Sequence, residues 1–151
     1  MGLNLSQLLG LTTRFRVVVD GDIDLGGWSK CTGLAVDFKP VFWEEGGNYE
    51  YKPILQGRIE YPPVTLVRAM NSVDSKRVQG WLKSRVADWV NASSSGGGGT
   101  AEITLLDSNL NPVASWSLRN VYPSKWDGPE LDVNTFGIAV EKLTIVHEGF
   151  L

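Results

Sequence analysis

The aspartates between Asp20 and Asp24 have the spacing that comes nearest to a metal site. Acidic side chains at alternate positions resemble the start of an EF-hand calcium loop, which needs Gly at its sixth position and Glu at its twelfth. Counted from Asp20, those two positions hold Leu25 and Cys31. The motif fails at both positions, so we expect a solvated hairpin turn here and no metal.

The other polar residues give little support to catalysis. His147 is the one histidine, so a Ser or Cys nucleophile would need it as a base, yet no G-x-S-x-G or similar motif accompanies it. Glu44 and Glu45 are adjacent and would point to opposite faces of a strand, which prevents them from acting together on one substrate. The glycines at 96–99 are not followed by the Lys-Ser/Thr of a phosphate-binding loop. We predict that the protein is not an enzyme and uses no cofactor.

Size and charge limit the remaining classes. A chain of 151 residues suits one domain. Its net charge is −3 and it has no run of Lys or Arg, which argues against a face that binds nucleic acid by neutralising phosphates. The single cysteine, Cys31, excludes an internal disulfide, and we expect it to be buried and inert. No apolar run reaches the roughly 20 residues of a membrane helix, and no signal peptide is recognisable, so we expect no direct membrane anchoring.

Short strands separated by turn residues make up most of the chain. The β-branched run at 14–19 ends at Asp20-Gly21, a hairpin signal because both residues tolerate positive φ. Further strands are expected within 25–43 and at 49–55, 64–68, 101–106, 113–118 and 138–146. This pattern predicts a mainly β fold, a single barrel or sandwich domain over 14–151 that follows a mobile N-terminal arm at 1–13.

One segment, 75–90, has the spacing of an amphipathic helix instead. Its apolar residues recur at i, i+3 and i+4, and Asp74 is a plausible N-cap. We expect the helix to flank the sheet, with both of its tryptophans, Trp81 and Trp89, in the core. A flexible Ser/Gly loop is expected to follow at 93–99.

The last strand changes phase along its length. Ile138 and Val140 share one phase, whereas Leu143 and Ile145 share the other. Either a bulge near Glu141-Lys142 re-aims the strand, or both of its faces are covered, as they would be if one face met another subunit.

Residues 25–48 indicate assembly more than catalysis. Leu34, Val36 and Phe38 alternate with more polar neighbours, as in a strand with one buried face, and a glycine-hinged acidic loop follows. This stretch also resembles the tail-tube proteins of contractile phages and related contractile injection systems. The resemblance covers roughly residues 14–150, and the residues that carry it are Trp28, Ser29, Cys31, Gly33, Leu34, 45–48, 66–68, Trp116, Asn120, Tyr122, Pro123, Glu141, Leu143, Ile145 and 147–150.

The resemblance implies a structural role. Proteins of this family fold as a β-barrel with a flanking helix, close into hexameric rings and stack into a hollow tube inside a contractile sheath. It implies that the chain's partners are other copies of itself, a sheath protein, baseplate and tube-terminating proteins, and a luminal cargo, either a protein effector or a phage genome. Assembly in the cytoplasm is expected, as part of a particle that is later released or docked at an envelope. The main contacts between rings would come from a loop comprising Trp43, Glu44, Glu45, Gly46, Gly47 and Asn48.

Two alternatives stay open. Trp28, Trp43, Trp116 and Trp126, if exposed, could form the platform of a carbohydrate-binding β-sandwich. Such a module should remain monomeric, whereas a tube subunit should associate with itself. A tube initiator or adaptor ring with the same fold would have a nearly identical sequence pattern.

Overall fold

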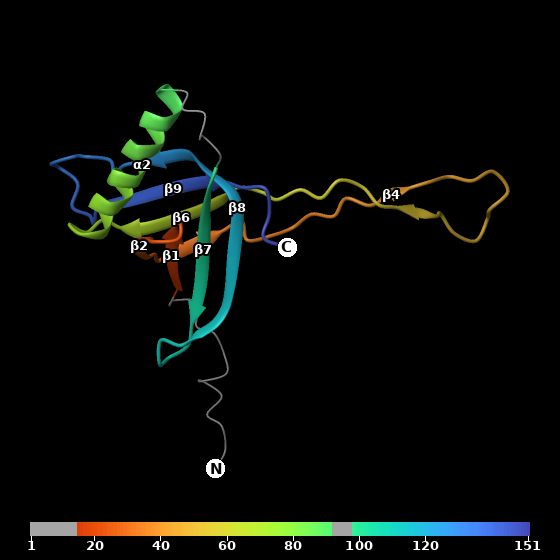
Figure 1. Ribbon diagram of the computed structural model, residues 1–151, viewed down its shortest axis with the longest axis horizontal. Coiled ribbons are helices and arrows are strands. Elements are labelled where there is room, and N and C mark those ends of the chain that lie inside the picture. Colours follow the sequence, from red (N-terminus) through yellow and green to blue (C-terminus); the bar gives the residue numbers. More distant parts are fainter. Residues whose placement is uncertain (1–14, 92–97) are drawn as a thin grey trace, which may run out of the picture.

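The computed structural model describes residues 15–91 and 98–151, and its main feature is one antiparallel sheet of seven strands flanked by a helix (Figure 1). In the sheet, the strand order is β2-β1-β7-β8-β9-β6-β3. The strands are β1 (Phe15–Val19), β2 (Ile23–Gly27), β3 (Lys30–Thr32), β6 (Val64–Ala69), β7 (Gly99–Leu106), β8 (Pro112–Asp127) and β9 (Val140–Val146). Helix α2 covers Asp74–Val90, and a separate two-stranded ribbon is formed by β4 (Val41–Phe42) and β5 (Ile54–Leu55).

The long strand β8 makes the sheet bend. Its first part pairs with β7 up to Val121, and its last part pairs with β9 from Tyr122 onward. Asn120, at the junction, has a positive φ of 50°. The two end strands of the sheet, β2 and β3, are joined by only Trp28 and Ser29, so the ends of the sheet meet at one corner. No ladder of hydrogen bonds joins β2 to β3 in the described part of the chain, so the sheet is curled but not closed into a barrel. The prediction of a mainly β fold is confirmed.

The hydrophobic core lies between the curled sheet and α2. It is built from alternate residues of the strands and from Val78 and Trp81 of the helix. The strands and the turn after β2 supply Phe15, Val17, Val19, Leu25, Trp28, Val64, Leu66, Ala101, Ile103, Leu118, Val121, Leu143 and Ile145. Trp89 was expected in the core and is 71% exposed, because the last turns of α2 extend past the sheet.

The start of α2 differs from the expectation. Asp74 is the first helical residue and not the N-cap, and the residue before it, Val73, makes no side-chain cap. The side chain of Asn71 accepts hydrogen bonds from the backbone N–H groups of Val73 (3.1 Å) and Asp74 (2.7 Å) instead. A polar residue three positions upstream therefore satisfies donors that an N-cap would otherwise take.

Two predicted strands are shorter than expected. The region 25–43 contains β2, β3 and β4, and residues 33–40 between the last two form no strand apart from a bridge at Asp37. Phe38, expected on a buried face, is 55% exposed. The predicted strand at 49–55 is reduced to β5. The predicted arm at 1–13 and most of the Ser/Gly loop lie outside the described residues, and Gly99 belongs to β7.

The phase change near the last strand has a different cause from a bulge. β9 alternates regularly, and Glu141 is buried in phase with Leu143 and Ile145. Its pairing with β6 runs without a shift through Glu141 and Lys142. A charged residue occupies a core position here, while Ile138 and Val140 are exposed, so the apolar pattern changes face without a bulge. Coverage of the exposed face by another subunit stays a prediction.

Glu141 is satisfied by a buried network. Its cross-strand neighbour Arg68 donates from Nε to Oε1 (2.6 Å), Ser75 Oγ donates to the same oxygen (3.0 Å), and Trp126 Nε1 donates to Oε2 (3.3 Å). Arg68 is only 3% exposed and Glu141 is fully buried. Arg68 Nη1 also donates to the backbone oxygens of Leu25 and Gly27 at the outer edge of β2. The pair thus connects four strands and the first turn of α2.

The C-terminal segment folds back along β8. Arg119 and Gly149 form an antiparallel bridge, and His147 Nδ1 accepts a hydrogen bond from the Gly149 N–H (3.1 Å). The His147 ring lies against Tyr61 and Phe150, with centroid distances of 5.5 and 6.1 Å. Burial lowers the pKa of His147 below its ordinary value of 6.5, and the nearby positive charge of Arg119 adds to this effect.

We predict that Glu141→Ala lowers the free energy of unfolding by about 3–5 kcal/mol, because it leaves the Arg68 guanidinium buried without its carboxylate. Urea denaturation followed by tryptophan fluorescence measures this loss. Glu102→Ala is the matched control, since Glu102 is an exposed glutamate on β7. Equal effects of the two substitutions would contradict a role for the buried pair.

Because the folded state favours neutral His147, its stabilising contribution should be complete above the unfolded pKa and should be lost as the pH falls toward the lowered folded pKa. We therefore predict that the difference in unfolding free energy between about pH 7.5 and about pH 5 is smaller in His147→Asn than in the unsubstituted protein. Asparagine keeps an acceptor for the Gly149 N–H but does not titrate. An unchanged difference would show that His147 takes no part in the acid response.

Candidate assembly interface

An extended arm, residues 37–60, projects from the sheet on the side opposite α2 (Figure 1). The arm continues the hairpin formed by β3 and β6. The pairing register is constant from Lys30↔Val67 through Thr32↔Thr65 to Asp37↔Glu60, where the two backbones exchange hydrogen bonds of 2.8 Å. The arm is therefore an interrupted two-stranded ribbon whose base is fixed by the main sheet.

The register shifts by one residue inside the arm. Between the bridge and the pair Val41↔Leu55, three residues (38–40) face four (56–59), which is the pattern of a bulge. Lys39 has a positive φ of 39°, and a Cβ added to Gly57 would collide with the Lys39 carbonyl oxygen. Lys39 also forms an ion pair with Glu60. Gly57 is thus needed for the two strands to approach each other at this point.

The predicted contact residues lie together at the tip of the arm. Trp43 N–H donates to the Pro53 carbonyl (2.9 Å), and Glu44 pairs with Lys52 across the ribbon (3.1 Å). Glu45, Gly46, Gly47 and Asn48 form a turn in which the Asn48 N–H donates to the Glu45 carbonyl (3.2 Å). Gly47 has a φ of 90°, and the third residue of a type II turn requires such a positive φ. Gly46, the second residue of the turn, has no positive φ.

Hydrophobic residues cover the arm on both sides. Nine large apolar or aromatic side chains of the arm are exposed: Phe38, Val41, Phe42, Trp43, Tyr49, Tyr51, Ile54, Leu55 and Ile59. Sequence reasoning named only Trp43 among them as a contact. The missed signal is that apolar residues occupy both faces of 38–42 and 49–55, which a half-buried strand does not do. A hollow of about 380 Å³ near the bulge is lined partly by Phe38, Leu55 and Ile59.

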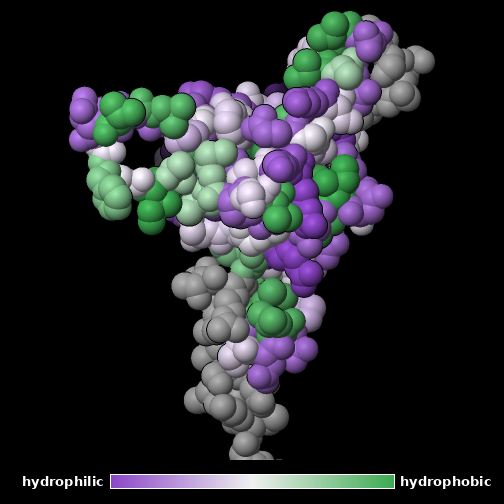
Figure 2. Space-filling model, turned by 90° about the vertical axis from the view of Figure 1, so that its left-hand side faces the viewer, coloured by the Kyte–Doolittle hydropathy of each residue, from purple (hydrophilic) through white to green (hydrophobic). Residues whose placement is uncertain are grey.

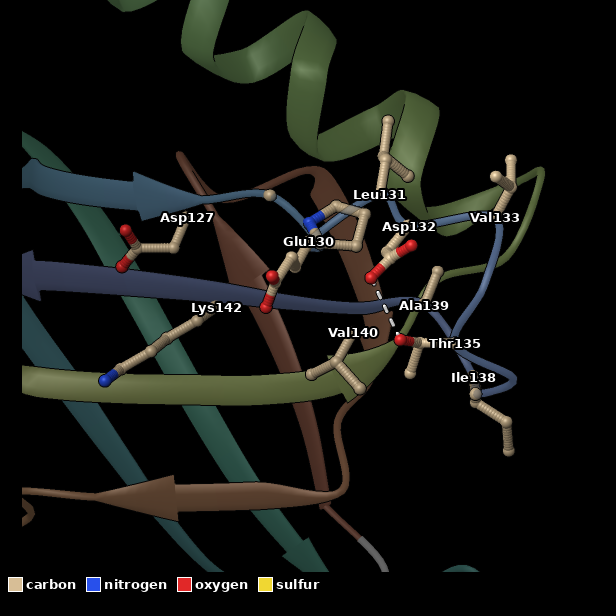
Figure 3. A pocket seen from close by; sticks show the side chains of 13 residues that line it. Asp127, Glu130, Leu131, Asp132, Val133, Thr135, Ile138, Ala139, Val140 and Lys142 are labelled. Atoms are coloured by element: carbon tan, nitrogen blue, oxygen red, sulfur yellow. Dashed lines mark hydrogen bonds between the residues drawn. The ribbon is translucent and has the colours of Figure 1, made fainter.

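A second exposed apolar segment is the loop 128–139 between β8 and β9. Leu131, Val133, Phe136 and Ile138 are 80–106% exposed. A space of about 700 Å³ lies between this loop and the neighbouring strands. Figure 3 shows Val133 and Ile138 at the far end of the loop, and the Thr135 hydroxyl donates to Asp132 there (3.0 Å). Sequence reasoning missed this loop.

The third exposed apolar surface is the end of α2, where Val86, Trp89 and Val90 are 61–74% exposed. Figure 2 faces the end of the molecule that is opposite the arm, and hydrophobic (green) residues are prominent on its projecting segments. A monomeric soluble protein rarely exposes several such patches, whereas assembly interfaces require them.

The residues considered for chemistry have structural roles. Asp20 accepts hydrogen bonds from Trp81 Nε1 (3.0 Å) and Arg85 Nη2 (2.7 Å), which fastens α2 to the β1–β2 turn. That turn is the predicted hairpin, with positive φ at Asp20 and Gly21. Within residues 15–91 and 98–151, no group of three or more His, Cys, Asp or Glu side chains could hold a metal ion.

Cys31 is half-buried, and burial raises the pKa of its thiol to about 11, so the thiolate is disfavoured at neutral pH. This agrees with an unreactive side chain. No helix in the described part of the chain is long and apolar enough to cross a membrane.

The carbohydrate-binding alternative is wrong, because it requires four tryptophans that are exposed together. Trp28 is only 3% exposed, and its ring lies 3.9 Å from the Arg68 guanidinium. Trp116 and Trp126 are partly buried against the core. Only Trp43 of the four is exposed, so these side chains do not form a platform.

Solved structures with a similar fold include chains of a contractile injection system and of the anti-feeding prophage. A chain of the extracellular contractile injection system PVC, in the extended sheath–tube complex, matches with a TM-score of 0.68 and 19% identity over 97% of this chain and 95% of that chain. Chains of the anti-feeding prophage match similarly. One, from the tube-terminating cap, has a TM-score of 0.67 and 21% identity over 95% and 89% of the two chains, and one from the baseplate has 0.67 and 18% over 93% and 92%.

Sequence comparison identifies the family directly. No protein with a curated function matches the chain at a significant level. The family described as T4-like virus tail tube protein gp19 matches residues 11–151, nearly the whole length. Together with the exposed arm and the fold, this match shows that the chain belongs to the family of T4-like virus tail tube proteins and is a structural tube subunit.

Proposed function

We propose that six copies of this chain close into a ring and that rings stack into a hollow tube through the arm 37–60. The contacts between rings would come from Trp43, Glu44, Glu45, Gly46, Gly47 and Asn48 at its tip. The observation that carries this proposal is the set of nine exposed hydrophobic side chains on the arm. A two-stranded ribbon has no core of its own, so only another molecule can cover them.

The partners follow from the particles in which similar chains occur. Those structures are a sheath–tube complex, a baseplate and a tube-terminating cap. We infer that this chain likewise meets a sheath protein, a baseplate and a terminating protein, and that its lumen holds a protein effector or a phage genome. The particle would assemble in the cytoplasm and then be released or docked at an envelope, without anchoring of this chain in a membrane.

The mechanism of such a tube is mechanical. Contraction of the sheath would drive a rigid tube through a target envelope, with no bond made or broken by this chain. Support for a role without catalysis comes from the use of Asp20, Glu141 and His147 in internal contacts. A tube initiator or adaptor ring is the second candidate, because the similar chains include one from a baseplate structure.

We predict that the purified chain forms sixfold rings or stacked tubes with a central hole, seen by negative-stain electron microscopy with the mass measured by light scattering. Many stacked rings would indicate a tube subunit, and rings that never stack would indicate an initiator or adaptor. A strictly monomeric particle at high protein concentration would contradict both roles.

The tip turn offers a matched pair of substitutions. Gly47→Ala should shorten or abolish tubes, because alanine at a φ of 90° costs on the order of 1–2 kcal/mol and distorts the tip. Gly46→Ala should leave the turn intact and shorten tubes less than Gly47→Ala does, since nothing in the monomer lies within 4 Å of the added Cβ and Gly46 has no positive φ. Deletion of 43–48 should leave a folded protein without long tubes. Tube length is measured by electron microscopy and folding by circular dichroism, and long, regular tubes from the deletion would disprove the role of the tip.

A further inference from the structure

The far half of α2 carries an apolar groove that nothing in the described chain fills. A hollow of about 250 Å³ is lined by Leu82, Arg85, Val86, Trp89, Val90 and Pro123. Trp89 lies on the same side of α2 as the buried Val78, but at the end of the helix, where Tyr122 and Pro123 of β8 lie near it. Its ring meets that of Tyr122 in a T-shaped arrangement, at a centroid distance of 6.2 Å, and Trp89 remains 71% exposed. The groove therefore lies on the apolar, core-facing side of α2, beyond the part of the helix that the core covers.

Positive charge borders this groove. Lys83, Val86 and Val90 follow one another at i, i+3 and i+7, so they share one side of the helix. Lys83 is exposed and forms no ion pair among the described residues. Arg85 contributes to the wall, although its Nη2 also pairs with Asp20 (2.7 Å). The nearest acidic residue of the helix, Asp88, lies on the opposite flank.

The arm tip has the complementary chemistry. Residues 43–52 contain three glutamates, at 44, 45 and 50, and one lysine, Lys52, which pairs with Glu44, so the tip remains net acidic and Glu45 is free to meet a cation. They also contain Trp43, Tyr49 and Tyr51, which are 56%, 97% and 66% exposed. An acidic segment with exposed aromatic rings matches an apolar groove bordered by a lysine in both charge and polarity.

The loop 128–139 is the rival acceptor for the tip, and its charge argues against it. Its space is lined by Asp127, Glu130 and Asp132, with Lys142 as the single basic residue. A tip with three glutamates would meet like charge there, which is unfavourable across an interface. The groove on α2 is the better match.

The two complementary surfaces also lie at opposite ends of the molecule. In Figure 1 the arm extends to one side, and α2 stands on the other. The arm tip of one chain therefore cannot fill the α2 groove of the same chain. A head-to-tail contact between copies leaves a free tip at one end and a free groove at the other, so the contact can repeat without limit. We propose that the arm tip of one copy docks in the α2 groove of a second copy, with its aromatic side chains in the hollow and Glu45 facing Lys83. This inference rests on the proposed stacking of rings and identifies the acceptor surface.

Zero-length carbodiimide crosslinking of assembled tubes tests the contact directly. Tubes are grown from equal parts of unlabelled and isotope-labelled chain, so that peptides joined between copies carry mixed labels in mass spectrometry. We expect mixed-label links from the tip glutamates to Lys83. The Glu44–Lys52 pair, 3.1 Å apart within the arm, is the internal control for coupling. Links from the tip to Lys142 instead, or no Lys83 link where the control link forms, would overturn the α2 assignment.

Charge reversal gives an independent test. Glu45→Lys and Lys83→Glu should each lower the fraction of protein that sediments as tubes by about tenfold or more, and the double substitution should restore it. Lys76→Glu, an exposed lysine on the same helix, and Glu102→Lys on β7 are the matched controls and should assemble normally. Loss of tubes in both single variants without rescue would contradict the contact while leaving the tube function intact. A chain that forms neither rings nor tubes when unsubstituted would overturn the tube function itself.

Discussion

Glu141 and Arg68 are cross-strand neighbours in the interior of the sheet, and the hydrogen bonds of this buried pair connect the elements around it, although Arg68 Nη2 has no partner among the described residues. A buried carboxylate or guanidinium costs several kcal/mol unless its hydrogen-bonding capacity is filled. Glu141 takes donors from β6, from the first turn of α2 and from the end of β8, while Arg68 reaches the carbonyls of β2. Strand pairing alone would leave β2 and β3 as free ends of the sheet. The hydrogen bonds of Arg68 to the Leu25 and Gly27 carbonyls hold the β2 end against β6, at the corner where the two ends of the curled sheet meet.

That corner is also the base of the arm. The arm departs from β3 and returns to β6, and the pairing register of the main sheet runs unchanged to Asp37 and Glu60. Its direction therefore derives from the core, since β6 carries Arg68 at its far end. Beyond the bridge, the bulge at Lys39 and Gly57 changes the register and the ribbon loses contact with the body. The tip is therefore joined to the core through the β3–β6 hairpin at the base of the arm.

The sequence predicted those features whose cause is local. The β1–β2 hairpin follows from Asp20 and Gly21, whose backbone preferences decide a turn without help from the rest of the chain, and the helix follows from its own periodicity. Glu141 could not be anticipated as a core residue, because its partner Arg68 is distant in sequence and apolar patterning treats both as surface residues. Trp89 was misplaced because periodicity indicates the side of a helix but not where the sheet beneath it ends. The tip residues were named through family resemblance, whereas most of the exposed hydrophobic arm became evident only in three dimensions.

The distribution of exposed hydrophobic residues explains how one chain can fold as a stable subunit and also polymerise readily. Each apolar side chain that becomes fully buried contributes about 1.5–3 kcal/mol, so half-covering the nine on the arm would yield on the order of 10 kcal/mol. Association of two proteins costs an estimated 4–15 kcal/mol or more, which means that one arm contact alone is close to balance. The end of α2 and the loop 128–139 are separate apolar surfaces, and a subunit inside a wall can cover all three at once. Growth onto an existing ring is then strongly favoured over pairing of two free chains, so a tube built from this chain should extend from a nucleus and not form at random.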